Sequence, residues 1–226
     1  GWLKRVAEIA RGHGAQLIAD EVMTGFGRTG GRLPGRNPQP GPLFASHVEG
    51  VQPDFMCVAK GLTGGYTPQA ATLTTQEVFD VFLGEYSEFK SFFHGHSFTG
   101  NQIGSAAGIA SMELLNTQTS IRARERLERQ FSKELQSLWS QENVGDVRQV
   151  GLLAGIELVK DWQTRKPFEL ADKAGIRVCD AMAARGVLTR PIGNVIMLMP
   201  PYCTTAKQLS KMVAALRESI DEIAGR

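Results

Sequence analysis

The sequence predicts an α/β fold with a second, smaller α+β domain. Helical and extended patterns alternate through residues 1–119, which is typical of a sheet covered by helices. An amphipathic helical pattern follows over residues 120–141, and residues 142–226 combine strands with two helices. The chain has 226 residues, of which 42% are hydrophobic, so it is long enough to bury a substantial core.

The first half begins with apolar residues at helical spacing, which predict a helix over residues 2–13. An apolar run then predicts a strand over residues 16–20 that ends at Asp20. After a loop rich in glycine and proline over residues 25–42, a second apolar run over residues 55–59 ends directly before Lys60. Further along we expect a strand over 70–74, a helix over 76–83, an extended segment over 91–97 and a helix over 101–115 whose small residues suit close packing.

The second half begins with a long amphipathic connector over residues 120–141. Its apolar residues recur at helical spacing, with charges between them: Ile121, Leu127, Phe131, Leu135 and Leu138. Beyond it the pattern predicts a strand over 147–158, a helix over 171–185 that ends at Gly186, two strands over 187–199 around a Gly-Asn turn, and a helix over 205–224.

Bulk composition argues against several classes of protein. A net charge of +2 from 25 basic and 23 acidic residues does not favour a nucleic-acid or membrane partner, and no apolar stretch reaches the ~20 residues of a membrane span. The three cysteines are few and far apart, which favours a reducing, cytoplasmic setting. The first residues lack an initiator methionine and already follow a helical pattern, so we expect the chain to begin within a longer protein.

An acid and an amine each stand at the end of a predicted buried strand. Asp20 closes one strand, Lys60 follows the other, and a glycine-rich segment comes after each. In α/β sheets, ligands bind at the carboxyl ends of strands. The amine can form a Schiff base with an aldehyde, and the acid can keep a pyridine nitrogen protonated. The pair therefore suits a pyridoxal phosphate site.

Other interpretations of these residues exist. The acidic strand also resembles that of an ATPase, but the phosphate-binding Gly-x-x-x-x-Gly-Lys-Ser/Thr loop is absent. His94 and His96 lack companion cysteine or acidic ligands, so a metal site is the weaker interpretation. A lysine at a strand end, such as Lys60, is ordinarily a surface residue. Arg190, which stands before Pro191 and the predicted Gly-Asn turn, could likewise be an ordinary surface arginine.

Several motifs in order resemble those of the class III aminotransferases, which are pyridoxal phosphate enzymes of fold type I. The matching segments are ADEVMTGFGRTG (19–30), KGLTGGY (60–66), ATLTT (71–75), HGHSFTGN (94–101), RPIG (190–193) and MPPY (199–202). The resemblance runs over essentially the whole chain and corresponds to about the C-terminal half of a family member. It implies that residues 1–119 belong to the large cofactor-binding domain with its mixed sheet, and residues 142–226 to the small C-terminal domain.

The resemblance also implies a role for each residue of the cofactor site. Lys60 would carry the cofactor covalently and later move the substrate proton, while Asp20 would pair with the ring nitrogen. Val22 would pack against the ring face. Ser97, with His96 beside it, would reach the cofactor phosphate across the interface of a homodimer whose active sites are shared.

For the substrate, the resemblance places Arg190 at a carboxylate of a small keto acid, with Gly95 and Lys60 nearby. The segments 71–75 and 199–202 are most similar to members that convert 8-amino-7-oxononanoate to 7,8-diaminononanoate in biotin synthesis. The amino donor is S-adenosylmethionine or lysine, because His96 and Met197 depart from residues found in members that use S-adenosylmethionine. The alternatives are a class III enzyme for ω-amino acids, diamines or γ-aminobutyrate, and a truncated fragment without catalytic activity.

Overall fold

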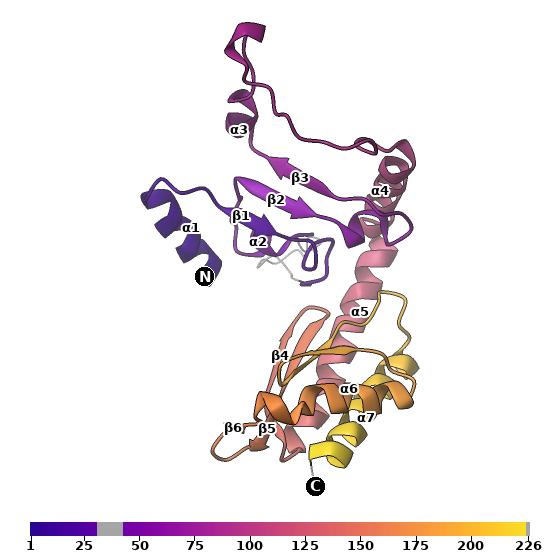
Figure 1. Cartoon of the computed structure of the whole chain (residues 1–226). Helices are drawn as coiled ribbons and strands as arrows, with labels where there is room; N and C mark the ends of the chain where they lie inside the picture. The colour runs from indigo at the N-terminus through magenta and orange to yellow at the C-terminus, as the bar shows by residue number, and fades with distance from the viewer. Residues whose placement is uncertain (31–42, 225–226) are drawn as a thin grey trace, which may run out of the picture. The chain divides into compact units, whose positions relative to one another are not determined.

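A computed structural model describes residues 1–30 and 43–224 of the chain (Figure 1). The chain divides into two compact units, Gly1–Ile121 and Arg122–Arg226. Residues 31–42, which form part of the predicted glycine- and proline-rich loop, lie outside the described residues. The domain boundaries expected at residues 119 and 141 stay predictions.

The first unit is built around a sheet whose described strands follow the order β1-β2-β3 (Figure 1). β1 (Ile18–Asp20) runs parallel to β2 (Phe55–Val58), and β2 runs antiparallel to β3 (Ala71–Thr74). The register pairs Asp20 with Cys57. The carboxyl ends of β1 and β2 therefore lie at the same edge of the sheet.

Two elements of the first unit are shorter than predicted. β1 begins at residue 18 instead of 16, since the backbone N–H of Leu17 donates to the Asp54 carboxylate at 2.7 Å instead of to a strand. α3 (Gln76–Asp80) ends before the predicted residue 83. The N–H groups of Phe82 and Leu83 donate to carbonyls three residues back, so the chain closes into a turn. The α-helices that precede α3 in the sequence are α1 (Trp2–Gly12) and α2 (Ala45–Val48).

α4 (Gln102–Leu115) lies against the short 3₁₀ helix η1 (Lys60–Thr63) (Figure 1). Gly104 and Gly108 are the buried residues of α4, and the predicted close packing is seen at Gly104, where an added Cβ would overlap the Gln69 carboxamide. A Cβ at position 108 would lie 3.6 Å from the Leu62 carbonyl oxygen, which is ordinary contact. The helix begins after Asn101, whose side chain accepts a hydrogen bond from the N–H of Gly104 at 2.8 Å and so caps it.

The first unit leaves many large apolar side chains exposed. Its buried cluster consists of Phe26, Met56 and Val58, with Phe44, Leu62, Ala71 and Leu115 packed against it. Between β3 and α4, by contrast, Phe93 is 74% exposed and Phe98 is 75% exposed. The 3₁₀ helix η2 (Tyr86–Glu88) lies in this segment. Residues 91–97, predicted to be extended, pair with no described strand.

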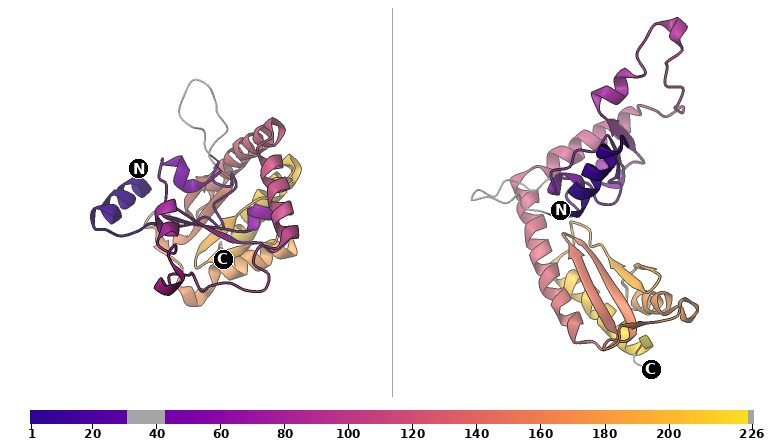
Figure 2. Two further views of the ribbon diagram at one scale, coloured as in Figure 1. Left: turned by 90° about the horizontal axis from the view of Figure 1, so that it is seen from above. Right: turned by 90° about the vertical axis from the view of Figure 1, so that its left-hand side faces the viewer.

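The second unit is an antiparallel sheet with helices. Its strands follow the order β4-β5-β8-β7, and β6 pairs with β5. Figures 1 and 2 show α6 and α7 side by side in this unit. The elements are α5 (Gln118–Leu135), which begins at the end of the first unit, η3 (Gln136–Ser140), β4 (Val144–Val150), β5 (Leu153–Asp161), β6 (Lys166–Pro167), η4 (Leu170–Asp172), α6 (Ala174–Ala184), β7 (Arg190–Ile192), β8 (Val195–Leu198) and α7 (Ala206–Ala224).

The second unit departs from the sequence predictions at two elements and agrees with them at one turn. The single strand expected over residues 147–158 is wrong, because the chain reverses at Gly151, whose φ of +57° suits glycine, and forms the β4–β5 hairpin. The helix expected from residue 171 begins at Ala174, since Lys173 has a φ of +50° and is not helical. The turn between two strands is confirmed at Gly193 and Asn194, where β7 meets β8.

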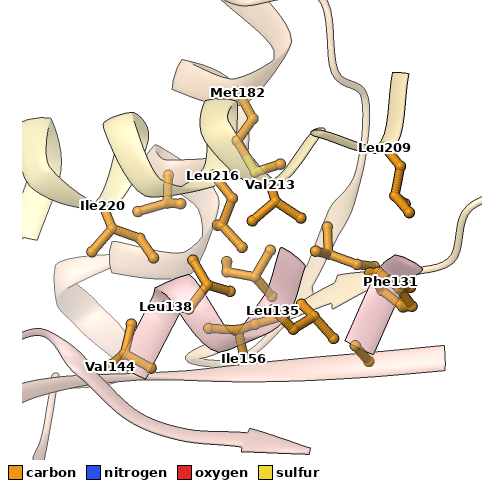
Figure 3. Packing of buried hydrophobic residues seen from close by; sticks show 14 of the residues in the cluster. Phe131, Leu135, Leu138, Val144, Ile156, Met182, Leu209, Val213, Leu216 and Ile220 are labelled. Atoms are coloured by element: carbon orange, nitrogen blue, oxygen red, sulfur yellow. The ribbon is translucent and has the colours of Figure 1, made fainter. Parts of the chain in front are cut away.

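The core of the second unit forms where helices meet the sheet (Figure 3). Leu209, Val213, Leu216 and Ile220 recur at helical spacing along α7, and all four are buried. They pack together with buried residues of α5, η3, α6 and the strands: Phe131, Leu135, Leu138, Val144, Ile156, Met182 and Ile196. The predicted amphipathic pattern of residues 120–141 thus corresponds to a helix that contributes to this core.

Candidate active site

Asp20 and Lys60 lie beyond the carboxyl ends of two neighbouring parallel strands. Asp20 ends β1, and the N–H of Glu21 continues the pairing by donating to the Cys57 carbonyl at 2.9 Å. Lys60 follows two residues after the last residue of β2, Val58, and begins η1. The topology therefore brings the acid and the amine to one edge of the sheet, as the two apolar runs led us to expect.

The Asp20 carboxylate is exposed and partly oriented by its own loop. Its Oδ1 accepts a hydrogen bond from the N–H of Val22 at 3.0 Å. This Asx-type bond aims the side chain along the loop that leaves the strand. Oδ2 has no hydrogen-bond partner in the part of the chain that the structure describes, so it is available to a donor such as a ring N–H.

Lys60 has an unusual backbone. Its φ is +42°, in the left-handed region that residues other than glycine rarely occupy, and such conformations cost about 1–3 kcal/mol each. The side chain is exposed, and its amine makes no ion pair or hydrogen bond with any described residue. A strained backbone that presents an uncommitted amine is typical of a functional position.

A buried carboxylate that sequence reasoning missed lies directly after Asp20. Glu21 is 2% exposed, and its two oxygens accept hydrogen bonds from the N–H of Ala45 at 3.0 Å, the N–H of Ser46 at 2.7 Å and the hydroxyl of Thr24. Burial raises the pKa of Glu21, but these hydrogen bonds outweigh it and hold the net pKa below its ordinary value. The carboxylate thereby joins the end of β1 to the first turn of α2.

The segment around Ser97 forms a compact turn before α4. The N–H of Phe98 donates to Nδ1 of His96 at 3.1 Å, and the N–H of His96 donates to the hydroxyl of Thr99 at 3.1 Å. Gly95, His96 and Ser97 are all exposed, and the Ser97 hydroxyl has no partner among the residues described. An exposed hydroxyl just before a helix N-terminus suits a phosphate group.

Arg190 belongs to the second unit, where it begins β7 opposite Met197 of β8. It lines a hollow of about 510 Å³ together with largely apolar residues, among them Leu188, Met197, Met199 and Met212. The Arg190 side chain is exposed. One guanidinium beside an apolar hollow suits a ligand that carries a carboxylate on an aliphatic chain. All the residues that line this hollow belong to the second unit.

The donor set fits pyridoxal phosphate. The described part of the first unit carries an exposed carboxylate, an exposed amine and the exposed Ser97 hydroxyl, the kinds of group that would meet the ring nitrogen, the aldehyde and the phosphate. Among the described residues, no group of three or more histidine, cysteine or acidic side chains is placed to hold a metal ion. No described helix is both long and apolar enough to cross a membrane.

Comparison with known proteins places these features in a family. The family described as "Aminotransferase class-III" matches residues 1–220. The curated adenosylmethionine-8-amino-7-oxononanoate aminotransferase of Anoxybacillus flavithermus is 46% identical over 222 residues, which are 98% of this chain and 46% of that protein. This chain therefore spans about half the length of the curated relatives that it matches.

Comparison with solved structures also identifies transaminases. The adenosylmethionine-8-amino-7-oxononanoate aminotransferase of Methanocaldococcus jannaschii has a TM-score of 0.86 and 41% identity, covering 99% of this chain and 49% of that one. An amine transaminase from an uncultivated Pseudomonas species, solved in its PLP-bound form, has a TM-score of 0.84 and 34% identity, covering 98% and 48%. These neighbours are transaminases of fold type I, so the predicted fold class is confirmed. The family match covers residues 1–220 of the 226 residues of this chain. The chain therefore belongs to the class III aminotransferases.

Proposed function

We propose that the polypeptide containing these residues is a pyridoxal phosphate-dependent aminotransferase of biotin synthesis, which converts 8-amino-7-oxononanoate to 7,8-diaminononanoate. The observation that carries this proposal is the position of Asp20 and Lys60 at one sheet edge of a class III aminotransferase. The names of the curated relatives support the substrate.

The chain's own residues would divide the work at the cofactor. When bound, pyridoxal phosphate supplies an electron sink for the substrate carbon that carries the amine. Lys60 would hold the cofactor through Nζ and, once released, move a proton from that carbon. Asp20 would keep the ring nitrogen protonated with its uncommitted Oδ2. Val22 would pack on the ring, while Ser97 and His96 would bind the phosphate.

Arg190 would hold the carboxylate of the keto substrate, with Gly95 and Lys60 contacting the other end. The support is chemical, since the guanidinium opens on an apolar hollow that suits the aliphatic chain between carboxylate and ketone. Burial of that chain against methionine side chains favours a long apolar substrate over a short polar one. A guanidinium binds a carboxylate bidentately and stays charged at all relevant pH values.

The amino donor is either S-adenosylmethionine or lysine. The names of the relatives favour the first, whereas the departures at His96 and Met197 favour the second. Met197 lies opposite Arg190 across β7 and β8 and lines the same hollow. The Met197 thioether accepts hydrogen bonds only weakly. An amino-donor substrate that relies on a hydrogen bond to a hydroxyl at this position would therefore bind less tightly here.

We further propose a cytoplasmic homodimer with shared active sites. Ser97 lies in an exposed segment that also exposes large aromatic side chains, including Phe89, Phe93 and Phe98. Exposed apolar patches of this kind mark surfaces that bind another chain. A second copy would cover them and bring each Ser97 to the cofactor of the opposite protomer.

Product analysis with the full-length polypeptide tests the function. The purified protein, loaded with pyridoxal phosphate, is given 8-amino-7-oxononanoate with either S-adenosylmethionine or lysine, and 7,8-diaminononanoate is measured by mass spectrometry. We expect product with one of the two donors, and none with the Lys60→Ala variant. Turnover of γ-aminobutyrate, diamines or ω-amino acids without any 7,8-diaminononanoate would replace the biotin assignment with another class III activity. Pyridoxal phosphate added to the 226-residue chain alone tests the alternative of a truncated, non-catalytic fragment: absence of the Schiff-base absorbance band would favour that alternative.

A further inference from the structure

We propose that Phe26 is a positioning residue for Lys60. It packs directly against Gly61, the residue that follows Lys60, and so links the loop after Asp20 to the backbone that presents the amine. This inference rests on the proposed role of Lys60 and adds a residue that touches neither cofactor nor substrate.

Phe26 occupies an unusual position for an aromatic residue. It is 2% exposed and has a φ of +62°, in the left-handed region, which is a clear outlier for a bulky side chain. Its ring packs edge to face on Phe44, with the centroids 5.4 Å apart. A buried aromatic ring held on a backbone of this conformation indicates a demand on where the ring lies.

Gly61 is the surface that the Phe26 ring contacts. A Cβ added at Gly61 would lie 2.9 Å from both Cβ and Cδ2 of Phe26, so no other residue fits without movement. From the other side, the hydroxyl of Ser111 in α4 donates to the Gly61 carbonyl at 3.1 Å. Gly61 is thus held between a packed ring and a hydrogen bond, immediately after the strained Lys60.

The loop that carries Phe26 begins directly after Asp20. Phe26 lies in a turn that opens at Glu21, where the N–H of Gly25 donates to the Glu21 carbonyl at 2.9 Å. A Cβ at Gly25 would lie 2.8 Å from the Glu21 carbonyl oxygen and 3.2 Å from the Phe44 ring, so this turn, like Gly61, has no room for a side chain. A continuous set of contacts therefore runs from the end of β1 through Phe26 to Gly61, and it holds the backbone that follows Lys60 relative to the strand end that carries Asp20.

Glycine and phenylalanine variants test the contact in the full-length polypeptide. Phe26→Gly removes the ring at a φ that glycine accepts, and Gly61→Ala pushes a methyl into the ring. Two controls match them. Lys173→Gly removes a side chain at another positive φ, in the second unit and outside the proposed cofactor site, and Gly108→Ala adds a methyl against the same 3₁₀ helix at ordinary contact distance. Pyridoxal phosphate is added to cofactor-free protein, and the rate at which borohydride fixes it to Lys60 is followed by peptide mass spectrometry.

We expect both test variants to slow fixation at Lys60 by about ten-fold or more, because small displacements of a reacting group have effects of this size. Both controls should stay within about two-fold. The double variant Phe26→Gly/Gly61→Ala should fix cofactor faster than Gly61→Ala alone, because the new methyl enters the space that the ring leaves. Visible circular dichroism of the bound cofactor, which reports its orientation, should change in the test variants and not in the controls.

Two results would overturn the inference: fixation in Gly61→Ala at the rate of Gly108→Ala, or no gain in the double variant. If Phe26→Gly does not fold, the comparison of Gly61→Ala with Gly108→Ala still decides. Failure of the wild-type protein to fix cofactor at Lys60 would instead refute the proposed function. The two failures are therefore distinguishable.

Discussion

Replacing Glu21 by glutamine should loosen the loop beside the site without changing its shape. The carboxylate binds the N–H of Ala45 through one oxygen and the N–H of Ser46 through the other. Glutamine keeps one oxygen and turns an NH₂ group toward a buried N–H. A hydrogen bond to a charged group contributes about 1.5–3 kcal/mol, and an orphaned buried donor costs about 1–3 kcal/mol, so we expect a total loss of about 2–4 kcal/mol.

Hydrogen exchange of the Ala45 and Ser46 amides measures this loss where it occurs. If those amides exchange by local opening, about 2–4 kcal/mol corresponds to about 30-fold to 900-fold faster exchange at pH 7. Glu8→Gln is the matched control, because Glu8 is exposed and paired with Arg5 at 3.2 Å, and exposed pairs contribute little. Less than three-fold faster exchange in Glu21→Gln would refute the anchoring role.

The pH dependence of this difference follows from the lowered pKa of Glu21. Burial raises that pKa, but the hydrogen bonds lower it further, to a net value below the ordinary 4.5. A carboxylate whose pKa is lowered on folding contributes its stability above the unfolded value and loses it as pH falls through the folded value. The gap in protection between wild type and Glu21→Gln should therefore be constant near neutral pH and shrink below about pH 4.5.

Three further predictions concern the proposed active site. Asp20→Asn should lose several kcal/mol of transition-state stabilisation, measured as kcat/KM, since the neutral amide no longer holds the ring proton; near-normal turnover would contradict this. Mixed dimers of Ser97→Ala and Lys60→Ala protomers should regain activity if sites are shared, because one site then carries neither change; demonstrably mixed but inactive dimers would argue against sharing. Arg190→Ala should lose about 2–5 kcal/mol, or about thirty-fold to several-thousand-fold in efficiency, on the keto acid, and equal loss on an uncarboxylated ketone would make Arg190 structural.

The sequence predicts the features that depend on local patterns. Asp20 and Lys60 each follow an apolar run, and such runs end where a strand meets a loop, so both strand ends could be placed. The spacing of Leu209, Val213 and Leu216 predicts α7 for the same reason. The β4–β5 hairpin was missed because its turn, at Gly151, stands between apolar residues and lacks the polar residues that mark most turns.

Features that depend on distant contacts could not be predicted. Glu21 looks like an exposed acid in the sequence, but the donors that bury it come from α2, 24 and 25 residues away. The contact between Phe26 and Gly61 joins two loops from different strands, and neither residue signals the other. The exposure of Phe93 could not be predicted either, since an apolar residue ordinarily predicts a buried position.

The most direct test of the account is the identity of the residue that binds the cofactor. Full-length protein is loaded with pyridoxal phosphate, reduced with borohydride, digested and analysed by mass spectrometry for the mass of the reduced cofactor. We predict a single labelled lysine, Lys60, and no label in the folded Lys60→Ala variant. A label at any other lysine, or a Lys60→Ala variant that still gives the reduced adduct, would contradict it.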